Sequence, residues 1–467
     1  MTETAPPTLI LGLGISGLAA AQLAAAQLAA AQGGAVVVLD AGDSSVLRER
    51  AGTLRAGGVD VRLGWTAEQW SGAAPAVAVI SPGIAPGSVL GRLAAGLGCP
   101  VISELEFGFR HCACPVLAIS GTNGKTTTTE LLEHCLRSAG KRVLAAGNIG
   151  VALCEAARRS RELDWLAVEV SSFQLESADR FAPAAAALLN ITPDHLDRYG
   201  SMSRYAAAKG LLFRNLRRAD RAVLRRDLLD WPEIRAALPR DGSRPVLFSG
   251  DDAGEADWFL RADGQLCRRR PDGGAVPLLS RRDLQLKGVH NLENVLAVCA
   301  LCELAGVPFA AIRPGLESFQ PSPHRLQWVG VDANGIAYIN DSKATNPDSL
   351  IRALETVRGE ITGQVLLVAG GLDKNMDFSS VPPHLARHVR GVCLIGSCRE
   401  RLAKEWNAVV YCEECESLAA AVDAAAGMAR PGDAVLLSPA CASMDMFVNY
   451  ADRGNRFCEL VKRRLEP

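Results

Sequence analysis

The chain has 467 residues, 48% of them hydrophobic and 22% charged. One domain usually takes roughly 100–200 residues, so a chain of this length is expected to form about three. The 50 Lys and Arg residues nearly balance the 51 Asp and Glu residues, and the net charge of −1 argues against a general nucleic-acid surface and a polybasic membrane anchor.

The start of the chain and its cysteines favour a cytoplasmic protein. The sequence MTETAPPTLILGLG lacks the basic start and cleavage site of a signal peptide. No stretch reaches about 18 uninterrupted apolar residues, so no membrane insertion is expected. The 14 cysteines are interpreted as small buried apolar side chains. A zinc site from the C-x-x-C pairs Cys299/Cys302 and Cys412/Cys415 is the less favoured alternative, because both pairs would have to converge.

The first segment alternates strands and helices. Strands are predicted at 8–14, 35–40 and 76–83, and the tandem Ala, Leu and Gln unit at 19–32 predicts a helix. The run GLGISG is a G-x-G-x-x-G, and Asp40 closes the next strand. This pattern suggests a nucleotide or dinucleotide site, and an NAD-dependent enzyme would be the default interpretation of the pattern alone.

A second α/β segment follows from about residue 115. Apolar runs at 115–120, 164–169 and 184–189 predict strands, and 289–307 predicts a helix. The stretch 240–285 is rich in Gly, Asp and Arg, which indicates small strands and turns. A third segment from about residue 319 has short apolar strands separated by helical stretches. Alternation of this kind predicts parallel sheets covered on both faces, so the fold class is α/β with three domains.

The strongest local pattern is SGTNGKTT at 120–127, between an apolar strand and a helix. Its glycines let backbone N–H groups face a phosphate, and the helix N-terminus adds positive potential. Lys125 can reach the β- and γ-phosphate oxygens, and the Thr126 hydroxyl can bind Mg²⁺. The spacing is shorter than a full Walker A motif because Ile119 stands where its first glycine is expected. An ordinary Gly-rich turn is the weaker alternative.

Three further polar residues are candidates on less evidence. Glu169 ends the strand 165–169, where a carboxylate beside a phosphate loop suits Mg²⁺. His195 and Lys209 lie in the stretch 190–209. Considered alone, a single His or Lys is more often structural or solvated than functional. The nucleotide loop makes an NAD site at the N-terminus less attractive than a domain that holds a nucleotide-bearing substrate.

Taken together, these motifs resemble the Mur ligase family over essentially the whole chain. The resemblance rests on GLGISG, SPG (81–83), SGTNGKTT, GNIG (147–150), EVSSFQLE (169–176), NITPDHLDRY, GVHNLENVLA (288–297), HR (324–325), NDSKATN (340–346) and LSPACASMD (437–445). Within the family, NDSKATN, LSPACAS and SSFQLE are similar to the members that add D-glutamate to UDP-N-acetylmuramoyl-L-alanine.

The resemblance implies three domains. These are a Rossmann-like domain for the UDP substrate at 1–103, a central P-loop ATPase domain at 104–322 and a Rossmann-like glutamate-binding domain at 323–467. It also implies ATP and two Mg²⁺ ions as cofactors, and a carbamate on Lys209. A monomer is the plain default.

The family pattern also assigns individual positions in this sequence. The positions that match the ATP-binding set are Gly121, Thr122, Asn123, Gly124, Lys125, Thr126, Thr127, Asn291, Arg325 and Asp341. Metal ligands are expected at Thr126, Glu169, His195 and the modified Lys209, and the catalytic group at Lys125, Glu169, His195 and Lys209. The UDP substrate is expected at Ile15, Ser16, Asp40, Ser81 and Asn148. Glutamate is expected at Thr345, Lys374, Ser443, Met444 and Tyr450.

The implied chemistry begins with transfer of phosphate from ATP to a carboxylate, which gives an acyl phosphate that the amine of glutamate attacks. Two alternatives remain open from the residues. One is a related ATP-dependent ligase for L-glutamate or another amino acid, such as a folylpolyglutamate synthase. The other is a nucleotide-binding regulator without ligase activity, which would leave NDSKATN and LSPACAS unexplained.

Overall fold

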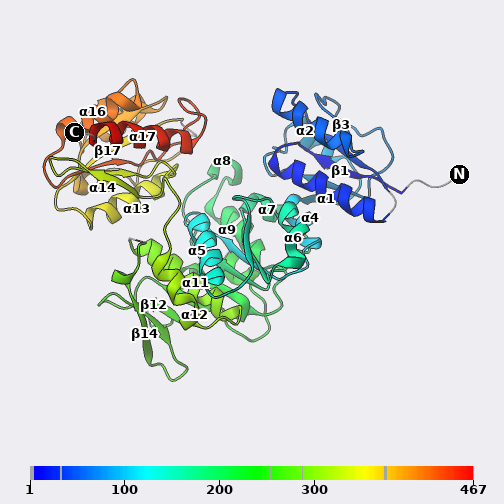
Figure 1. Ribbon diagram of the computed structural model, residues 1–467, viewed down its shortest axis with the longest axis horizontal. Helices are drawn as coiled ribbons and strands as arrows, with labels where there is room; N and C mark the ends of the chain where they lie inside the picture. The colour runs from blue at the N-terminus through cyan, green and yellow to red at the C-terminus, as the bar shows by residue number, and fades with distance from the viewer. Residues whose placement is uncertain (1–4, 32–33, 253, 287, 373–375, 466–467) are drawn as a thin grey trace. The chain divides into compact units, whose positions relative to one another are not determined.

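The computed structural model describes residues 5–31, 34–252, 254–286, 288–372 and 376–465. Within these residues the chain forms three β-sheets of five, nine and six strands, with helices between the strands (Figure 1). Most neighbouring strands are parallel. The predicted α/β class is therefore confirmed as a mixed α/β fold with three sheets that are mainly parallel.

The first sheet is wholly parallel, in the order β3-β2-β1-β4-β5. Its strands are β1 (Thr8–Leu11), β2 (Val36–Leu39), β3 (Asp60–Arg62), β4 (Val77–Ile80) and β5 (Val101–Ser103), and its helices are α1 (Ile15–Ala31), α2 (Ser45–Ala56) and α3 (Val89–Ala95). The three predicted strands and the predicted Ala-rich helix are present. Helix α1 lies against β1, β2 and β4. The helix is drawn in dark blue beside β1 in Figure 1.

Helix α4 (Glu104–Arg110) leads from the first sheet to the second. The second sheet has the order β14-β13-β12-β11-β10-β9-β6-β8-β7, in which β6 to β12 pair in parallel and β13 and β14 add an antiparallel edge. The strands are β6 (Val116–Ser120), β7 (Val143–Gly147), β8 (Trp165–Glu169), β9 (Ala185–Leu188), β10 (Ala222–Arg225), β11 (Val246–Ser249), β12 (Trp258–Leu260), β13 (Gln265–Arg269) and β14 (Ala275–Ser280).

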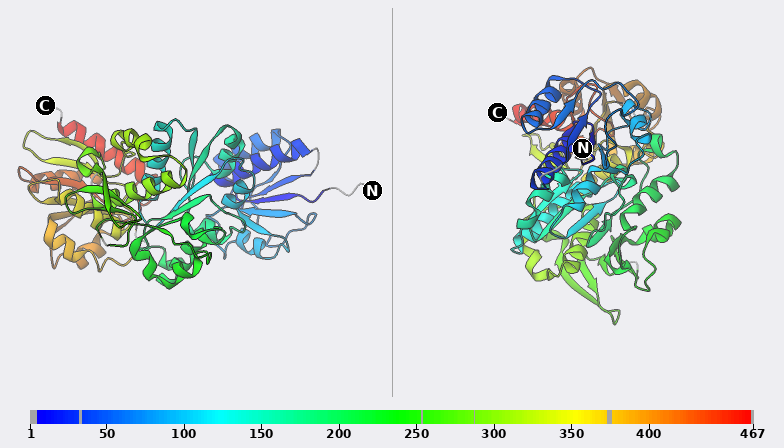
Figure 2. Two further views of the ribbon diagram at one scale, coloured as in Figure 1. Left: turned by 90° about the horizontal axis from the view of Figure 1, so that it is seen from below. Right: turned by 90° about the vertical axis from the view of Figure 1, so that its right-hand side faces the viewer.

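The helices of this middle segment are α5 (Lys125–Ser138), α6 (Leu153–Arg159), α7 (Ser172–Glu176), α8 (Leu196–Tyr199), α9 (Met202–Gly210), α10 (Pro232–Ala237), α11 (Val289–Leu304) and α12 (Phe309–Ser318). Helix α5 lies against β6, β7 and β8, and α12 packs beside α5 (Figure 1). The small strands expected within 240–285 are β11 to β14. The last two form a hairpin, drawn in green, that extends from the edge of the sheet (Figures 1 and 2).

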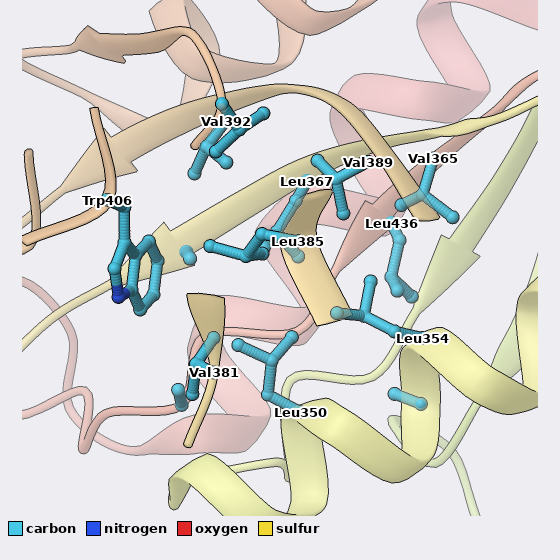
Figure 3. Packing of buried hydrophobic residues seen from close by; sticks show 14 of the residues in the cluster. Leu350, Leu354, Val365, Leu367, Val381, Leu385, Val389, Val392, Trp406 and Leu436 are labelled. Carbon is cyan, nitrogen blue, oxygen red and sulfur yellow. The ribbon is translucent and has the colours of Figure 1, made fainter. Parts of the chain in front are cut away.

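The third sheet has the order β15-β16-β20-β17-β18-β19, with only β15 antiparallel. Its strands are β15 (Gln327–Val331), β16 (Ala337–Asn340), β17 (Val365–Gly370), β18 (Val389–Ile395), β19 (Cys412–Glu414) and β20 (Ala434–Leu437), and its helices are α13 (Pro347–Arg358), α14 (Pro382–His388), α15 (Arg399–Trp406), α16 (Leu418–Met428) and α17 (Tyr450–Leu465). Buried clusters cover both faces of the sheet. On one face, Leu350, Leu354, Leu367, Leu385 and Trp406 point toward one another (Figure 3).

The chain divides into two compact units. The first comprises Met1–Ile191, Ser201–Arg281 and Glu293–Ser318, and the second Thr192–Gly200, Arg282–Leu292 and Phe319–Pro467. The first unit therefore contains two of the sheets. The predicted domain boundaries at 103/104 and 322/323 stay a prediction, although the three sheets lie within the three predicted ranges.

The other expectations concern membranes and cysteines. None of the helices in the described part of the chain is long and apolar enough to cross a membrane. All 14 cysteines are thiols, and most are buried. Cys299 and Cys302 lie inside the buried helix α11, whereas Cys412 and Cys415 lie at β19 in the other unit. Among the described residues, no group of three or more His, Cys, Asp or Glu side chains is arranged to hold a metal ion by itself.

Candidate active site

The predicted phosphate loop follows β6, the third strand from the β7 end of the second sheet. Strand β6 runs into residues 121–124, and α5 begins at Lys125. Strand β6 pairs with β8 on one side, where Ile119 is opposite Glu169, and with β9 on the other, where Ser120 is opposite Leu188. Because parallel strands share the edge at which they end, this loop, Glu169 and the residues after β9 lie at one edge of the sheet. Ligands of open α/β sheets bind at this edge.

Gly124 makes the turn into α5 possible. Its φ of 81° is in the left-handed region that favours glycine. A Cβ atom at this position would lie 2.6 Å from Oδ1 of Asn294 and would collide with it. The close approach brings the first turn of α5 against α11. Thr126 is half-buried and Thr127 is buried in this turn.

Asn190 holds the loop from the next strand. Its side-chain oxygen accepts a bond from the N–H of Asn123 at 2.8 Å, and its amide donates to the carbonyl of Asn123 at 3.0 Å. The N–H of Thr122 donates to the carbonyl of Asn190 at 3.0 Å. The Thr122 hydroxyl lies 3.3 Å from the hydroxyl of Tyr205. The sequence did not predict three of these site residues, Asn190, Asn294 and Tyr205. Two of them lie close to predicted features, since Asn190 opens the NITPDHLDRY motif and Asn294 lies one helical turn after Asn291.

Two lysines converge on one backbone oxygen of the loop. Lys125 Nζ donates to the carbonyls of Gly121 at 2.9 Å and Thr122 at 2.7 Å, and Lys209 Nζ donates to the same Gly121 carbonyl at 2.7 Å. Lys209 is 1% exposed, and its Nζ lies 4.6 Å from the centre of the Tyr205 ring. Two amino groups around one oxygen at a helix N-terminus create a strongly positive site, which suits the phosphates of a nucleotide.

Glu169 provides a negative group in the same region. Its side chain is 1% exposed, and Oε1 accepts a bond from the amide of Asn148 at 2.8 Å. The backbone N–H of Asn148 donates to the carbonyl of Glu169 at 2.9 Å. The other oxygen, Oε2, is buried and has no hydrogen-bond partner among the described residues. A buried carboxylate oxygen without a partner is costly, so this group fits a bound Mg²⁺ ion.

Two other predicted residues, His195 and Asn291, belong to the second unit. His195 is exposed, has a φ of 53° and precedes α8, and its Nε2 lies 3.6 Å from the Asp194 carboxylate. Asn291 is half-buried in the first turn of α11, a helix that begins in the second unit and continues in the first. Their expected roles toward metal and ATP stay predictions.

A second candidate ligand site, the cradle formed by the glycine turn, Asp40 and Ser81, lies where β1 and β4 end. The strand order of the first sheet reverses at this point. The Asp40 carboxylate accepts bonds from the N–H groups of Leu13 at 2.6 Å and Gly42 at 2.7 Å and so holds the glycine turn. The Ser81 hydroxyl is buried and has no hydrogen-bond partner within the described ranges. It faces this turn, since a Cβ at Gly12 would lie 2.8 Å from it.

The remaining residues predicted at this cradle lie on the following helix. Ile15 is 67% exposed and Ser16 is half-buried, both in the first turn of α1. The unused Ser81 hydroxyl and the exposed helix start together fit an anionic ligand such as a diphosphate.

A third group of polar residues gathers where β16 and β20 end. Asp341 accepts a bond from the Ser438 hydroxyl at 2.9 Å and from the N–H of Leu326 at 3.1 Å. Burial raises the pKa of the Asp341 carboxyl to about 7, and the nearby charge of Arg325 opposes this shift. Arg325 is half-buried between His324 and Leu326, whose φ values of 68° and 46° show strained backbone on both sides.

Arg453 connects the segments that carry the predicted glutamate residues. It is fully buried and donates to the hydroxyl and carbonyl of Ser342 and to the carbonyl of Cys441. Lys343 Nζ lies 3.9 Å from the centre of the Tyr450 ring. Neither Arg453 nor Lys343 was predicted as a site residue, since their packing depends on segments about a hundred residues apart in sequence.

The other predicted glutamate residues differ in exposure. Ser443 is buried, Thr345 is half-buried and Met444 is 62% exposed. Lys374 lies outside the described residues. The structure thus places Asp341, Ser443 and Tyr450 on segments that meet at one edge of the third sheet, and it leaves the assignment of Lys374 as a prediction.

Comparison with known families identifies two matching models. The model described as Mur ligase middle domain matches residues 119–302, and the model described as Mur ligase, glutamate ligase domain matches residues 324–441. Curated relatives named UDP-N-acetylmuramoylalanine–D-glutamate ligase match most of the chain. The protein from Acidobacterium capsulatum is 41% identical over 82% of this chain and 81% of its own length, and that from Frankia casuarinae is 40% identical over 98% and 94%.

Solved structures show the same fold at lower identity. UDP-N-acetylmuramate-alanine ligase MurC from Thermotoga maritima is 18% identical, with a TM-score of 0.60 over 98% of this chain and 100% of its own. MurF from Acinetobacter baumannii is 19% identical, with a TM-score of 0.60 over 92% and 91%. A folylpolyglutamate synthase from Mycobacterium tuberculosis is 17% identical, with a TM-score of 0.58 over 74% and 92%. These likenesses concern the fold alone.

Proposed function

Because the chain belongs to the Mur ligase family, among the relatives named UDP-N-acetylmuramoylalanine–D-glutamate ligase, we propose that it joins D-glutamate to UDP-N-acetylmuramoyl-L-alanine with ATP. It is a carbon–nitrogen ligase of peptidoglycan precursor synthesis. The observation that supports the ATP half of this reaction is the convergence of Lys125 and Lys209 on the Gly121 carbonyl, beside the unpaired Glu169 oxygen.

The reaction runs through an acyl phosphate in this proposal. The carboxylate of the UDP-linked alanine attacks the γ-phosphorus of ATP, and ADP leaves. The amine of D-glutamate, after losing a proton, attacks the acyl carbon to form a tetrahedral intermediate. Inorganic phosphate leaves as the amide forms. ATP is needed because a free carboxylate is a poor electrophile.

The residues around the phosphate loop serve the first step. The N–H groups at the start of α5, exposed by the turn at Gly124, bind the phosphate chain. Lys125 now bonds to two carbonyls of its own loop, and it turns to the terminal phosphate when a nucleotide binds. Its charge stabilises the negative charge that develops during phosphoryl transfer. Asn291, Arg325 and Asp341 are proposed as further ATP contacts.

Mg²⁺ fits the oxygen ligands of this region. Glu169 would hold one ion through its unpaired oxygen, together with Thr126, and His195 and a carbamylated Lys209 are proposed for a second. The ions supply positive charge that offsets the charge of ATP and of the substrate carboxylate. The Asn148 amide keeps Glu169 in place by donating to its other oxygen.

A carbamate on Lys209 fits its surroundings. The side chain is almost fully buried next to Lys125, so two positive charges would share one carbonyl oxygen. A carbamate makes the Lys209 side chain anionic and keeps one N–H group, which can still donate to the Gly121 carbonyl. This change removes the repulsion and creates an oxygen ligand for metal.

The first and third sheets hold the two other substrates in this proposal. The strand order β3-β2-β1-β4-β5 supports a Rossmann-like UDP domain, with the diphosphate at the glycine turn near Ile15, Ser16, Asp40 and Ser81. Thr345, Lys374, Ser443, Met444 and Tyr450 are proposed to surround D-glutamate, with Lys374 pairing with one of its carboxylates. A monomer and a cytoplasmic location remain predictions.

One coupled assay tests the activity. ADP formation with Mg²⁺ is measured with UDP-N-acetylmuramoyl-L-alanine and D-glutamate together, with each one omitted, and with L-glutamate or other amino acids instead. We expect ADP only when both substrates are present, with D-glutamate preferred. ADP release without any amino acid would support a nucleotide-binding regulator, and a preference for L-glutamate would support a related ligase.

A further inference from the structure

Glu104 is a buried acid for which neither the ligase chemistry nor the expected binding sites give a role. It is the first residue of α4, directly after β5, and it is 1% exposed. Ser103 caps this helix, with its hydroxyl accepting a bond from the N–H of Glu106 at 3.3 Å. The Glu104 side chain is therefore buried at the junction where the first sheet ends and the segment of the second sheet begins.

The carboxyl group of Glu104 caps a different helix. Its Oε1 accepts a bond from the N–H of Cys154 in the first turn of α6 at 2.6 Å. The residue before α6 is Ala152, which has no side-chain group to accept that bond. The Cys154 thiol in turn donates to the Glu104 carbonyl at 3.4 Å. Glu104 thus supplies from 50 residues away what a helix usually receives from its own N-cap residue.

Close packing makes this contact stiff. A Cβ atom at Gly108 of α4 would lie 2.8 Å from the backbone nitrogen of Cys154, so the two helices touch through their backbones. Ala152, Cys154 and Ala157 also belong to the buried cluster that includes Ile10 and Val38 of the first sheet. Helix α6 is therefore attached to the first sheet, although it lies between two strands of the second in sequence.

The first turn of α6 is directly connected to the active site. The loop 147–151 precedes it and is closed by a bond from the N–H of Gly147 to the carbonyl of Val151 at 2.8 Å. Within this loop, the Asn148 amide donates to Glu169 Oε1 at 2.8 Å. Only Ala152 separates Val151 from the helix. A shift of the first turn of α6 would therefore move Asn148 relative to Glu169.

The second oxygen of Glu104 distinguishes it from a simple structural anchor. Oε2 is buried and has no hydrogen-bond partner in the described part of the chain. Glu106, two residues later, is the contrast, because its oxygens accept bonds from the Arg110 side chain and from three N–H groups at 179–181. The same helix thus holds one fully paired acid and one that keeps an unpaired oxygen at a cost in stability.

We propose that Glu104 is a positioning residue for the ligase reaction, which sets the place of Asn148 and its bond to Glu169 through the first turn of α6. This proposal rests on the proposed function. It assigns to the junction between the first two sheets the task of aligning the UDP-substrate contact with the metal-binding carboxylate. The residue touches neither substrate nor metal and acts through α6.

Three variants distinguish a positioning role of Glu104 from a general effect on the stability of the protein. Glu104→Leu removes the acceptor at similar volume, whereas Glu104→Gln keeps an oxygen for the Cys154 N–H. Ser160→Ala is the matched control, because Ser160 is a buried residue at the other end of α6 whose hydroxyl donates to the Ala157 carbonyl and accepts from the N–H of Ala113. All three are assayed as full-length protein with saturating ATP and Mg²⁺.

We expect E104L to raise KM for UDP-N-acetylmuramoyl-L-alanine about tenfold and to change KM for D-glutamate less than about twofold. E104Q, which keeps the acceptor oxygen, should have a KM within about twofold of the parent value. S160A should lower the melting temperature without changing this KM. In a double-mutant cycle, E104L combined with N148A should raise KM no further than N148A alone, because both changes act on the same contact.

Amide hydrogen exchange provides a readout that does not need activity. E104L should speed exchange at residues 148–153, and E104Q and S160A should not. The proposal is overturned if E104L and S160A have the same KM values and exchange rates. It is also overturned if the separate effects of E104L and N148A on KM multiply in the double variant. Absence of ADP formation by the parent protein would count against the proposed function alone, since the exchange measurement still decides the role of Glu104.

Discussion

At the residue scale, the phosphate loop depends on two lysines with different tasks. Lys125 belongs to the loop itself, whereas Lys209 reaches the Gly121 carbonyl from α9, 88 residues away in sequence. Lys209 is buried and is proposed to carry a carbamate, whereas Lys125 is proposed to remain a cation. The two residues should therefore respond differently to added anions.

Small carboxylic acids should restore part of the activity that is lost when Lys209 is replaced by Ala. We expect Lys209→Ala to lower kcat by about 100-fold or more, because an ordering group for metal is removed. Bicarbonate or short carboxylic acids should restore part of the rate, since a carboxylate can occupy the vacated space. Lys125→Ala is the control, with a similar loss that these acids do not repair. Full activity of K209A without any added acid would contradict the assignment.

Asp341 should make stability depend on pH. Burial raises its pKa in the folded protein to about 7, above the value of about 3.9 in an unfolded chain. The folded state therefore holds a proton that the unfolded state has lost, so the contribution is complete below about pH 4 and is lost as pH rises through about 7. Asp341→Asn, which resembles the protonated acid, should remove this dependence.

The measurement is the free energy of opening of β16 and β20, obtained from amide hydrogen exchange between pH 5 and pH 8. Relative to D341N, the parent should lose up to about 1.4 kcal/mol for each pH unit below about pH 7, where only the folded state holds the proton, and the loss should level off above this pH as the folded acid ionises. Parallel curves for the two proteins over this range would show that Asp341 is already ionised when the chain folds.

At the element scale, helix α5 offers a comparison between its two ends. Gly124 before the helix and Gly140 after it have similar φ values, 81° and 78°. A Cβ atom at Gly124 would meet Asn294, whereas nothing lies within 4 Å of a Cβ atom at Gly140. Alanine should therefore strain the backbone at both positions but disturb the phosphate loop only at the first.

We expect Gly124→Ala to weaken Mg·ADP binding about tenfold or more, because the loop must move away from α11. Gly140→Ala should cost about 1 kcal/mol of unfolding free energy and leave nucleotide affinity unchanged. Calorimetric titration and urea unfolding of both variants provide the two measurements. Equal losses of affinity would mean that helix strain, and not the Asn294 contact, controls the loop.

Sequence reasoning succeeded where the information is local. The phosphate loop, Glu169 at its strand end and the Ala-rich helix follow from short patterns of residue type and spacing, and the structure places them as predicted. The bonds that complete the site join distant segments. Examples are Asn190 with Asn123, Asn148 with Glu169 and Glu104 with Cys154, and no local pattern encodes such pairs.

At the scale of the whole molecule, the proposed ATP contacts are distributed over both compact units. Lys125 and Glu169 belong to the first unit, and Asn291, Arg325 and Asp341 to the second. The sequence did not predict that 192–200 and 282–292 group with the C-terminal part of the chain, because this grouping depends on contacts between remote segments. Hydrogen exchange can show whether a bound nucleotide stabilises both units.

Mg·ADP should stabilise both units if these contacts are correct. A ligand at 100 times its Kd adds about 2.7 kcal/mol to the stability of the state that binds it. We expect hydrogen exchange to slow in both units on addition of Mg·ADP, and to slow in neither when Lys125 is replaced by Ala. Protection limited to the first unit would remove Asn291, Arg325 and Asp341 from the nucleotide site.

The tandem unit in α1 bears on how this chain can change in length. Five residues turn an α-helix by about 500°, so each copy of Ala-Ala-Ala-Gln-Leu is rotated by about 140° from the one before and lies about 7.5 Å further along. Leu23 is consequently buried, whereas Leu18 and Leu28 are half-buried. Alanine tolerates either environment. Because the unit repeats, gain or loss of one copy during replication would leave the residue type at each remaining position of the repeat unchanged and would alter the helix in length, by about 7.5 Å.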